Sequence, residues 1–513
     1  MKYLLGVDIG TSGARSAVLT EEGDFVKSAY TTHTYNIPNP GWAEQEADVY
    51  WESFCEVAKE AAEWVEEQNG ELAGLSISGL TPDVLPINKK GEAIYPAILW
   101  LDRRGTDEDE WIRKNIGEEK VFELSANTVD PYYGLVELLW LKNKEPEIYK
   151  KAYKFLNVKD YVAYKVTGEI TMDYTQAGCT GIGFDIRNKR WDPEMFNKLG
   201  LDIEKMPMLV ECEQVIGHTQ PEIEEATGLE PGIPVVAGAG DAMASMMAAG
   251  ISEVGENVVA LGTSAVWGFL GESDEFAKNM LVTPAVGYKD MYLTSAAPAF
   301  TGGVFKWMRD EIMKDVEDGA YDTMNEEAAK INPGADGLIT LPYFAGERSP
   351  VWDARARGVV LGLSTDHTRA QLFRSGLEAV AFALLDSLKY IRESGTEISD
   401  DMVVTGGMAK SKLLREILAN ALNMNVIYIG GNVSAEVGVA YIAGRGVGIF
   451  DSYEVAKDKL EVIDKIEPDP EINEIYEDYY EKVYKKMHPA LEEIFADNYD
   501  IRAKVDKIME ARK

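Results

Sequence analysis

The chain has 513 residues and a formal net charge of −36. This length exceeds one hydrophobic core and predicts two or three domains, while the negative charge argues against nucleic acid or an anionic membrane as partner. No segment carries the ~20 apolar residues that span a bilayer, and the start reaches Asp8 too early for a signal peptide, so we expect a cytoplasmic protein.

Strand-like and helix-like segments alternate along the chain, which predicts the α/β class. The first half begins with a β-meander over residues 2–33, and the segment 231–241 predicts a buried strand that ends in a glycine turn and Asp241. Between them we expect an amphipathic helix at 48–68, a strand at 72–78, a polar hairpin at 88–91 and helices near 134–145, 158–167 and 192–200.

The meander pattern starts again at Asn257, after a stretch at 250–256 in which Gly, Ser and acidic residues interrupt the apolar runs. A long helix is expected at 368–393, a strand at 402–404, and a glycine turn that opens another helix. We therefore predict an N-terminal domain over 1–250, a C-terminal domain over 251–455 and a helical tail over 456–513 packed on the second domain.

The tripeptide Gly-Thr-Ser occurs at residues 10–12 and again at 262–264, each time between two apolar runs that read as strands. A tight glycine hairpin lets backbone N–H groups reach phosphate oxygens, and Arg15 lies close after the first hairpin. Two such hairpins predict a polyphosphate held from two sides. A plain β-turn at both places explains the tripeptides equally well on local sequence alone.

Two aspartates follow predicted strands at positions suited to phosphoryl transfer. Asp241 fits a general base for a substrate hydroxyl, and Asp8 fits a ligand of hydrated Mg²⁺; an inert helix cap and an Asx turn are the respective alternatives. Gly406-Gly407 allows close backbone approach to a nucleotide, although strand-to-helix turns use glycine for many reasons. The sequence contains no P-loop and lacks the third glycine of a dinucleotide fingerprint after Gly240, which argues against a Rossmann dehydrogenase.

The segment GERSPVWDARARGVVLGLS, residues 346–364, closely resembles the second signature of the FGGY carbohydrate kinases. The resemblance runs from residue 1 to about residue 490. Within the family it is nearest to the xylulokinase branch, on the basis of Lys159-Asp160-Tyr161 and residues 406–411. Further landmarks are GVDIGTSG at 6–13, PGWAEQ at 40–45, WLDRR at 100–104, AGD at 239–241 and LGTS at 261–264.

This resemblance implies an actin-like fold, with two ribonuclease-H-like domains and the active site in the cleft between them. It also implies Asp241 as catalytic base, ATP and Mg²⁺ as cofactors, and sugar-facing positions at Thr81, Pro82, Asp102 and Tyr132. The nucleotide contacts that it implies are Gly10, Thr11, Ser12, Arg15, Gly262, Thr263, Gly302, Lys306, Gly406, Gly407 and Ser411.

Three departures from the family pattern affect the sugar side. Thr81-Pro82 stands where xylulokinases usually carry a Met-His or Gln-His pair, Ala242 stands where related kinases carry Asn or Gln, and Glu137 replaces a customary lysine of the first signature. We therefore expect a sugar kinase whose nucleotide half is intact and whose acceptor preference is altered.

The predicted function is transfer of the γ-phosphoryl group of ATP to a small sugar, with a pentulose as the first choice of acceptor. The alternatives are glycerol, erythritol, ribulose or gluconate as acceptor, or a non-catalytic actin-fold protein that binds nucleotide. We expect no nucleic-acid or membrane partner, and a homodimer is the assembly considered.

Overall fold

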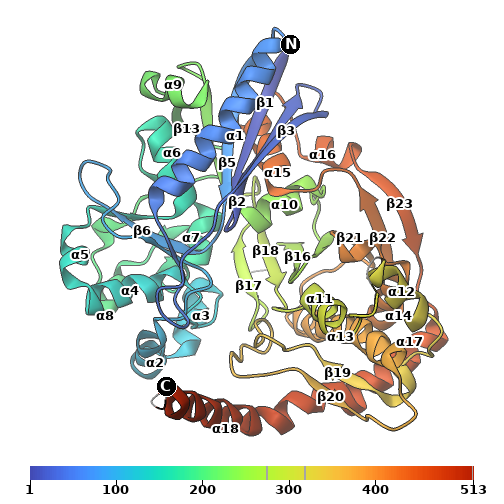
Figure 1. Ribbon diagram of the computed structural model, residues 1–513. Coiled ribbons are helices and arrows are strands. Elements are labelled where there is room, and N and C mark those ends of the chain that lie inside the picture. Colours follow the sequence, from blue (N-terminus) through green and yellow to red (C-terminus); the bar gives the residue numbers. More distant parts are fainter. Residues whose placement is uncertain (273–274, 317–318, 511, 513) are drawn as a thin grey trace. The chain divides into compact units, whose positions relative to one another are not determined.

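The computed structural model describes residues 1–272, 275–316, 319–510 and 512, with the side chain of residue 510 left out (Figure 1). The chain forms two compact units. Unit 1 comprises Met1–Val254, Leu270–Thr294 and Gly431–Glu461, and unit 2 comprises Gly255–Phe269, Ser295–Gly430 and Val462–Lys513. The units interleave along the chain, so the sequence division at 250/251 and 455/456 stays a prediction about family domains. Among the described residues, no helix is both long and apolar enough to cross a membrane.

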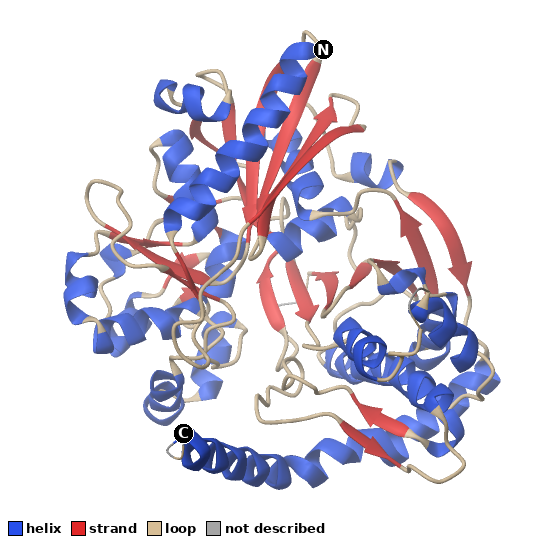
Figure 2. Cartoon of the chain, in the orientation of Figure 1, coloured by secondary structure: helices blue, strands red, loops and turns tan. Residues whose placement is uncertain are grey.

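Unit 1 is built on a six-stranded sheet in the order β13-β14-β5-β1-β2-β3, drawn in red in Figure 2. β1 pairs antiparallel with β2 and parallel with β5, and β14 extends the parallel part. The predicted meander is therefore confirmed as three strands. The bounds are β1 Lys2–Ile9, β2 Gly13–Thr20, β3 Phe25–Thr32, β5 Glu71–Gly79, β13 Val215–His218 and β14 Pro234–Gly240.

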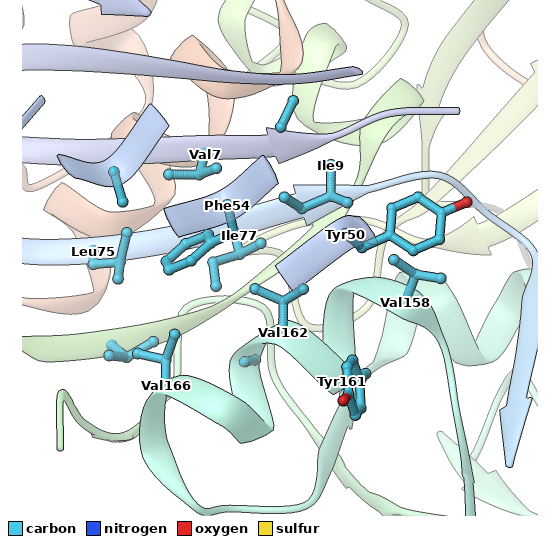
Figure 3. Packing of buried hydrophobic residues seen from close by; sticks show 14 of the residues in the cluster. Val7, Ile9, Tyr50, Phe54, Leu75, Ile77, Val158, Tyr161, Val162 and Val166 are labelled. Carbon is cyan, nitrogen blue, oxygen red and sulfur yellow. The ribbon is translucent and has the colours of Figure 1, made fainter. Parts of the chain in front are cut away.

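One face of this sheet is buried under α1 (Ala47–Glu67) and α6 (Val158–Thr167). Successive side chains of a strand point to opposite faces, so alternate apolar residues of β1 and β5 join a single core with these two helices. Figure 3 shows Val7, Ile77 and Phe54 in this core. The amphipathic patterns that predicted both helices are confirmed.

The opposite face of the sheet contacts α15 (Ala435–Gly446), which also lies against α10 (Asp241–Ala248). The approach is close enough to require glycine. A Cβ atom at Gly6 would lie 1.9 Å from the carbonyl oxygen of Glu436, and one at Gly438 would lie 1.8 Å from that of Ala244. No side chain fits either gap, so these glycines fix how near the three elements lie to one another.

The rest of unit 1 surrounds a smaller sheet in the order β4-β7-β6-β8, with a second apolar core beneath it. The strands of this part of the unit are β4 Glu44–Gln45, β6 Asp83–Ile87, β7 Ala97–Leu99, β8 Lys154–Leu156, β9 Thr171–Asp173, β10 Phe184–Asp185, β11 Arg190–Trp191, β12 Met208–Val210 and β17 Leu281–Pro284. The helices are α2 Thr106–Asn115, α3 Glu118–Ser125, α4 Gly134–Lys144, α5 Pro146–Lys151, α7 Tyr174–Thr180, α8 Pro193–Leu199, α9 Glu224–Thr227 and α16 Glu454–Asp458.

Unit 2 repeats the strand pattern of unit 1. β15 (Asn257–Leu261) pairs antiparallel with β16 (Ala265–Gly271) and parallel with β21 (Asp401–Thr405), as β1 does with β2 and β5. The order continues through β22 and β23. The remaining elements are β18 Tyr292–Ala296, β19 Ile339–Leu341, β20 Val359–Leu361, β22 Asn425–Gly430, α11 Gly302–Glu311, α12 Ala320–Ala328, α13 Arg369–Glu393 and α14 Lys412–Leu422.

The predicted helical tail is wrong at one point, because residues Glu461–Ile466 form the strand β23. This segment, with two apolar residues followed by two charged ones, completes an edge of the unit 2 sheet, where tertiary pairing overrides a mixed local signal. Beyond it α17 (Pro470–Tyr479), a π-helical stretch and α18 (Lys485–Glu510) follow. Tyr476 and Tyr480 donate hydrogen bonds from their hydroxyls to Glu378 and Asp386 of α13.

Candidate functional site

The first glycine hairpin, residues 10–12, joins β1 and β2 and is held from outside by two side chains. The indole N–H of Trp100 donates to Thr11 Oγ1 at 3.0 Å, and His33 Nε2 lies 3.0 Å from the carbonyl oxygen of Gly10. Burial lowers the pKa of His33, which keeps the ring neutral. Trp100 opens the WLDRR landmark, whereas His33 lies in none of the motifs named above, and both reach the hairpin only through the fold.

Asp8 ends β1 beside this hairpin and is one of three neighbouring carboxylates in unit 1. Ser78 of the adjacent strand donates to Asp8 Oδ1 at 2.8 Å. Burial raises the pKa of Asp8 to about 7, and the charges of Asp241 and Glu436 raise it further. Such a concentration of negative charge, with one hydroxyl donor and the opposing influence of Arg15, leaves Asp8 poised to gain a cation.

Asp241 is the first residue of α10, immediately after β14 ends at Gly240. Its carboxylate accepts the backbone N–H of Ala242 at 2.7 Å, and burial raises its pKa to about 6. It is therefore ionised at neutral pH yet close enough to its pKa to accept and release a proton. The hydrogen bond to Ala242 is also what an inert cap would make, so geometry alone leaves both interpretations open.

A buried hydrogen-bond chain fixes the backbone just before Asp241. The N–H of Gly240 donates to Thr175 Oγ1 at 2.9 Å, and the Thr175 hydroxyl donates to Asp173 Oδ1 at 2.5 Å. Asp173 in turn pairs with Lys159, whose ammonium also lies 2.8 Å from Asp160 Oδ1. Lys159 further donates to the Ala237 carbonyl at 2.9 Å, so β14 is anchored to the network at two points.

Some of the residues expected to face the sugar lie close to Gly240. A Cβ at Gly240 would lie 3.0 Å from Thr81 Cγ2, and the hydroxyl of Tyr132 lies 3.3 Å from the Thr81 carbonyl. Thr81, Pro82 and Tyr132 thus share the surroundings of the strand that carries Asp241. Asp83, the next residue, is buried and accepts the N–H of Val158 at 2.7 Å.

Asp102 is placed differently from the other three. It is fully buried, and its carboxylate accepts the backbone N–H groups of Ala43 and Arg104 together with two N–H groups of the Arg104 guanidinium. Arg104 lies 3.8 Å from the ring centroid of Trp42 and pairs with Glu44 at 2.6 Å. These contacts show that Asp102 stabilises its own loop. They give no support to its expected contact with the sugar.

Glu137, the residue that replaces the customary lysine, is buried in α4 with 1% of its surface exposed. Within the described parts of the chain neither carboxylate oxygen has a hydrogen-bond partner. Burial raises its pKa well above the ordinary value, and the nearby charge of Asp102 adds to the shift against the opposing effect of Arg104. The group is accordingly held in its neutral, protonated form at neutral pH.

The second glycine hairpin belongs to unit 2 and lines a pocket of about 490 Å³. Its floor is formed by α11, α12, α13 and the turn into α14. Phe305, Phe373 and Leu377 supply apolar surface, and Lys306, Lys410 and Asn325 supply polar groups. Six of the expected nucleotide contacts line this pocket: Gly262, Thr263, Gly302, Lys306, Gly407 and Ser411. A mixed lining of this size suits a drug-sized or nucleotide-sized ligand.

Glycines around this pocket have different reasons to be glycine. A Cβ at Gly302 would lie 2.3 Å from the Gly262 carbonyl oxygen, and Gly406 has φ +97° with the Leu261 carbonyl 2.5 Å from its notional Cβ. Both are therefore required by the backbone. Gly407 has an ordinary φ of −63° and nothing within 4 Å of its Cβ position, so its open side faces empty space at the pocket wall.

The signature segment at 346–364 supports the strand end that leads into α11. Glu347 accepts the N–H of Ala299 at 2.6 Å and that of Arg348 at 2.8 Å, and Ser349 Oγ accepts the N–H of Ala297 at 2.6 Å. Glu347 is buried, and burial raises its pKa to about 7. Through these hydrogen bonds the longest family motif in the chain stabilises the backbone that precedes Gly302.

Unit 2 thus carries a nucleotide-sized pocket, and unit 1 carries a carboxylate at the end of a strand. The model of the FGGY family of carbohydrate kinases matches residues 3–248 with its N-terminal domain and residues 257–447 with its C-terminal domain. The chain belongs to this family. It is an ATP-dependent carbohydrate kinase with the two-domain, actin-like fold, as the sequence predicts.

The relatives carry several substrate names. A xylulose kinase of Staphylococcus xylosus is 28% identical over 95% of this chain and 100% of its own length. A gluconokinase of Bacillus subtilis is 26% identical over 89% of this chain and 90% of its own length. The crystal structure of a xylulose kinase from Rhodospirillum rubrum matches with a TM-score of 0.89 and 25% identity, covering 96% of this chain and all of that one.

We expect Gly407→Leu to weaken nucleotide binding strongly while leaving the fold intact. The new Cβ would have no protein atom within 4 Å, and the backbone there is ordinary, so the side chain extends from the pocket wall. Calorimetric titration with ATP and with ADP measures the effect. The matched control is Lys412→Leu, an exposed position at the start of α14 outside the pocket lining. Equal affinity in both variants would show that this pocket does not hold the nucleotide.

Glu347→Gln should remove one contribution to the pH dependence of the free energy of unfolding. Because the folded pKa of about 7 lies above the unfolded value of 4.5, the wild-type carboxyl favours the folded state at low pH and loses that contribution as pH rises from about 4.5 to about 7. The free energy of unfolding of the Gln variant, relative to wild type, should therefore rise by ~3 kcal/mol across this window.

Urea unfolding at intervals between pH 4.5 and 8 tests this expectation, with the exposed Glu397→Gln as control. A wild-type and Glu347→Gln difference that stays constant across the window would show that Glu347 titrates normally.

Proposed function

We propose that Asp241 is the general base of this kinase and that the acceptor is a pentulose. The observation that carries the proposal is the carboxylate at the junction of β14 and α10, ionised near neutral pH and fixed by the Thr175 chain. The proton of the acceptor hydroxyl passes to Asp241 as its oxygen bonds to the γ-phosphorus. The bond from that phosphorus to the bridging oxygen breaks, ADP leaves, and Asp241 later returns the proton to water.

For the nucleotide, we propose that the unit 2 pocket holds the adenosine part. The apolar side chains of Phe305, Phe373 and Leu377 suit a purine, while Lys306 and the polar pocket wall suit the ribose and phosphates. The remaining nucleotide contacts proposed from the family are those of the first hairpin, Gly10, Thr11, Ser12 and Arg15, together with Gly406. Backbone N–H groups carry more of this binding than in a basic protein, since the net charge of −36 repels the ligand.

The residues present fit a magnesium ion at Asp8. Oxygen donors are the ligands that Mg²⁺ prefers, and the raised pKa of Asp8 shows negative charge that the protein alone leaves uncompensated. Among the described residues no group of three or more His, Cys, Asp or Glu side chains is placed to hold a metal ion by itself. When bound, the ion neutralises charge on the phosphates; Asp8 would hold it and Ser78 would orient Asp8.

The choice of a pentulose rests on the xylulose kinases among the relatives. The altered positions Thr81-Pro82 and Ala242 favour a pentulose other than D-xylulose, because an imidazole and an amide are absent. The sequence raised Asp83 and Asp102 as possible replacements for these groups. Both are buried and engaged within unit 1, which makes that compensation harder. Gluconate is the second candidate acceptor, since a gluconokinase is also among the relatives.

Asp241→Asn should lower kcat by ~10²–10⁴, the range for loss of a general base, with little change in nucleotide affinity. The amide keeps the shape of the carboxylate and cannot take the proton. Coupled ADP-release assays and calorimetry measure the two quantities. Wild-type turnover in this variant would make Asp241 a helix cap and remove the proposed mechanism.

Thr175→Val should lower kcat by ~10- to 100-fold through misplacement of Asp241, because the N–H of Gly240 loses its acceptor. Thr175→Ser keeps the hydroxyl and should restore most of the rate, whereas a purely steric role would favour Val, which matches Thr in shape. Thr175 would then be a positioning residue. Equal rates for the Val and Ser variants contradict this role.

Across D-xylulose, ribulose, glycerol, erythritol and gluconate, we expect kcat/KM to be highest for ribulose and clearly lower for D-xylulose. Each hydroxyl that loses its partner on binding costs roughly 1–3 kcal/mol, which corresponds to about a 5- to 150-fold preference. A preference for D-xylulose would mean that other groups replace the missing donors, and a preference for gluconate or a polyol would remove the pentulose assignment.

A further inference from the structure

A second pocket, of about 620 Å³, lies within unit 1 and is here called the α6 pocket. Its lining comes from parts of residues 46–51, 90–93, 161–168 and 220–226. The volume falls within the range of about 300–1,000 Å³ that small-molecule sites occupy. None of the residues assigned above to the nucleotide, the acceptor or the magnesium ion is among the described residues that line it. The α6 pocket is therefore separate from the catalytic machinery.

One face of α6 forms a wall of this pocket. It carries four lining residues at the spacing of a single helix face: Tyr161, Tyr164, Lys165 and Gly168. A second face of the helix packs on the unit 1 sheet, and Figure 3 shows Val162 and Val166 in that core. Because the helix is anchored in this way, the pocket wall is part of the folded structure and needs no ligand to form it.

Tyr161 brings a hydroxyl group without a protein partner to the pocket. The residue is 2% exposed, and its hydroxyl forms no hydrogen bond with any described residue. Burial, with further contributions from Asp48 and Tyr164, raises the pKa of this hydroxyl to about 12, so it lies near two other residues of the lining. Buried polar groups are normally hydrogen-bonded, and this one is available to a ligand.

The pocket also presents charged groups that do not pair with one another. Five charged side chains of the lining form no hydrogen bond and no ion pair within the described chain: Glu46, Asp48, Glu222, Lys90 and Lys165. The start of α1 adds backbone N–H donors, because its N-cap residue makes no side-chain hydrogen bond to the helix. A carboxylate only accepts hydrogen bonds and an ammonium group only donates them. A ligand that satisfies both kinds of group must itself donate and accept.

Aromatic rings supply the apolar part of the lining. Lys165 Nζ lies 5.3 Å from the centroid of the Trp51 ring, which places this ammonium group beside an aromatic surface. The turn at 90–93 lies directly against Tyr164, since a Cβ at Gly91 would lie 2.1 Å from the Tyr164 hydroxyl oxygen and Gly91 has φ +77°. Only glycine allows this approach. Tyrosine and tryptophan each combine a flat apolar body with a polar end.

We propose that the α6 pocket is a second, non-catalytic binding site for a neutral sugar. Each hydroxyl of a sugar both donates and accepts, so it bonds to carboxylates, ammonium groups and the Tyr161 hydroxyl alike, while the C–H groups of the sugar ring lie on the aromatic side chains. An anion is repelled by the carboxylates of the lining and by the net charge of −36. A cation is repelled by Lys90 and Lys165. The proposal is independent of the acceptor and of the catalytic role of Asp241.

Saturation-transfer-difference NMR on the full chain tests the proposal, with D-xylose and maltose as neutral probes. We expect saturable binding with a dissociation constant of roughly 1 mM. Ala226→Trp places a large ring in the pocket from an exposed position of α9 and should weaken this binding at least tenfold. The matched control is Glu225→Trp, exposed on the same helix and outside the lining, which should bind as wild type does. Unchanged kinase turnover in both variants reports that the fold is retained.

Tyr161→Phe removes the unpartnered hydroxyl alone. It should weaken sugar binding by ~2- to 12-fold, the effect of losing one hydrogen bond, whereas Tyr153→Phe, exposed elsewhere in unit 1, should have no effect. Gluconate and the diamine putrescine serve as charged probes and should bind more weakly than both sugars. Equal sugar binding by wild type and Ala226→Trp, unchanged affinity in Tyr161→Phe, or tighter binding of either charged probe at this pocket would overturn the proposal.

Discussion

The site in unit 1 depends on the contact of α15 with β1 and α10. Two glycines permit this contact, and a methyl group at either place would meet a carbonyl oxygen at under 2 Å. The result is electrostatic as well as steric, since it brings Glu436 into the field of Asp8 and Asp241. Burial and mutual repulsion then raise the pKa of Asp8, and that energetic cost is relieved when a cation or a proton arrives. The fold thus creates a local affinity for positive charge at Asp8, beside the first glycine hairpin.

Much of the fold could be predicted from local pattern, because strands and helices with one buried face show their period directly. The helices α1, α6 and the long α13 were of this kind, whereas β1, β2 and β14 are buried on both faces and were predicted from their continuous apolar runs. β23 was missed because its sequence is mixed in polarity and its strand character comes from pairing with the neighbouring strand. The interleaving of the two units also lies beyond local pattern, since residues 431–461 join the first unit only through contacts with distant strands.

For the site, sequence motifs gave residues whose backbone or carboxylate follows a strand, and six of those expected to contact the nucleotide line the unit 2 pocket. The motifs could not identify side chains that act by positioning other groups. Thr175 and His33 have no motif of their own, and the motif that contains Trp100 does not reveal its contact with the first hairpin. All three become relevant only when the chain brings them to Gly240 or to that hairpin. Asp102 shows the converse. The family resemblance implied a ligand contact, but a neighbouring arginine takes up its hydrogen-bonding capacity.

Glu137 shows how an apparently drastic replacement can be a mild one. Replacing a lysine with an ionised glutamate would change the charge by two units. Because the Glu137 carboxyl stays protonated and uncharged, the charge of the buried region changes by only one unit. Arg104 already neutralises Asp102, which lets Glu137 remain uncharged beside it. The interior therefore tolerates the exchange without a new counter-ion. A carboxyl of this kind adds two polar oxygen atoms to the buried region without adding charge.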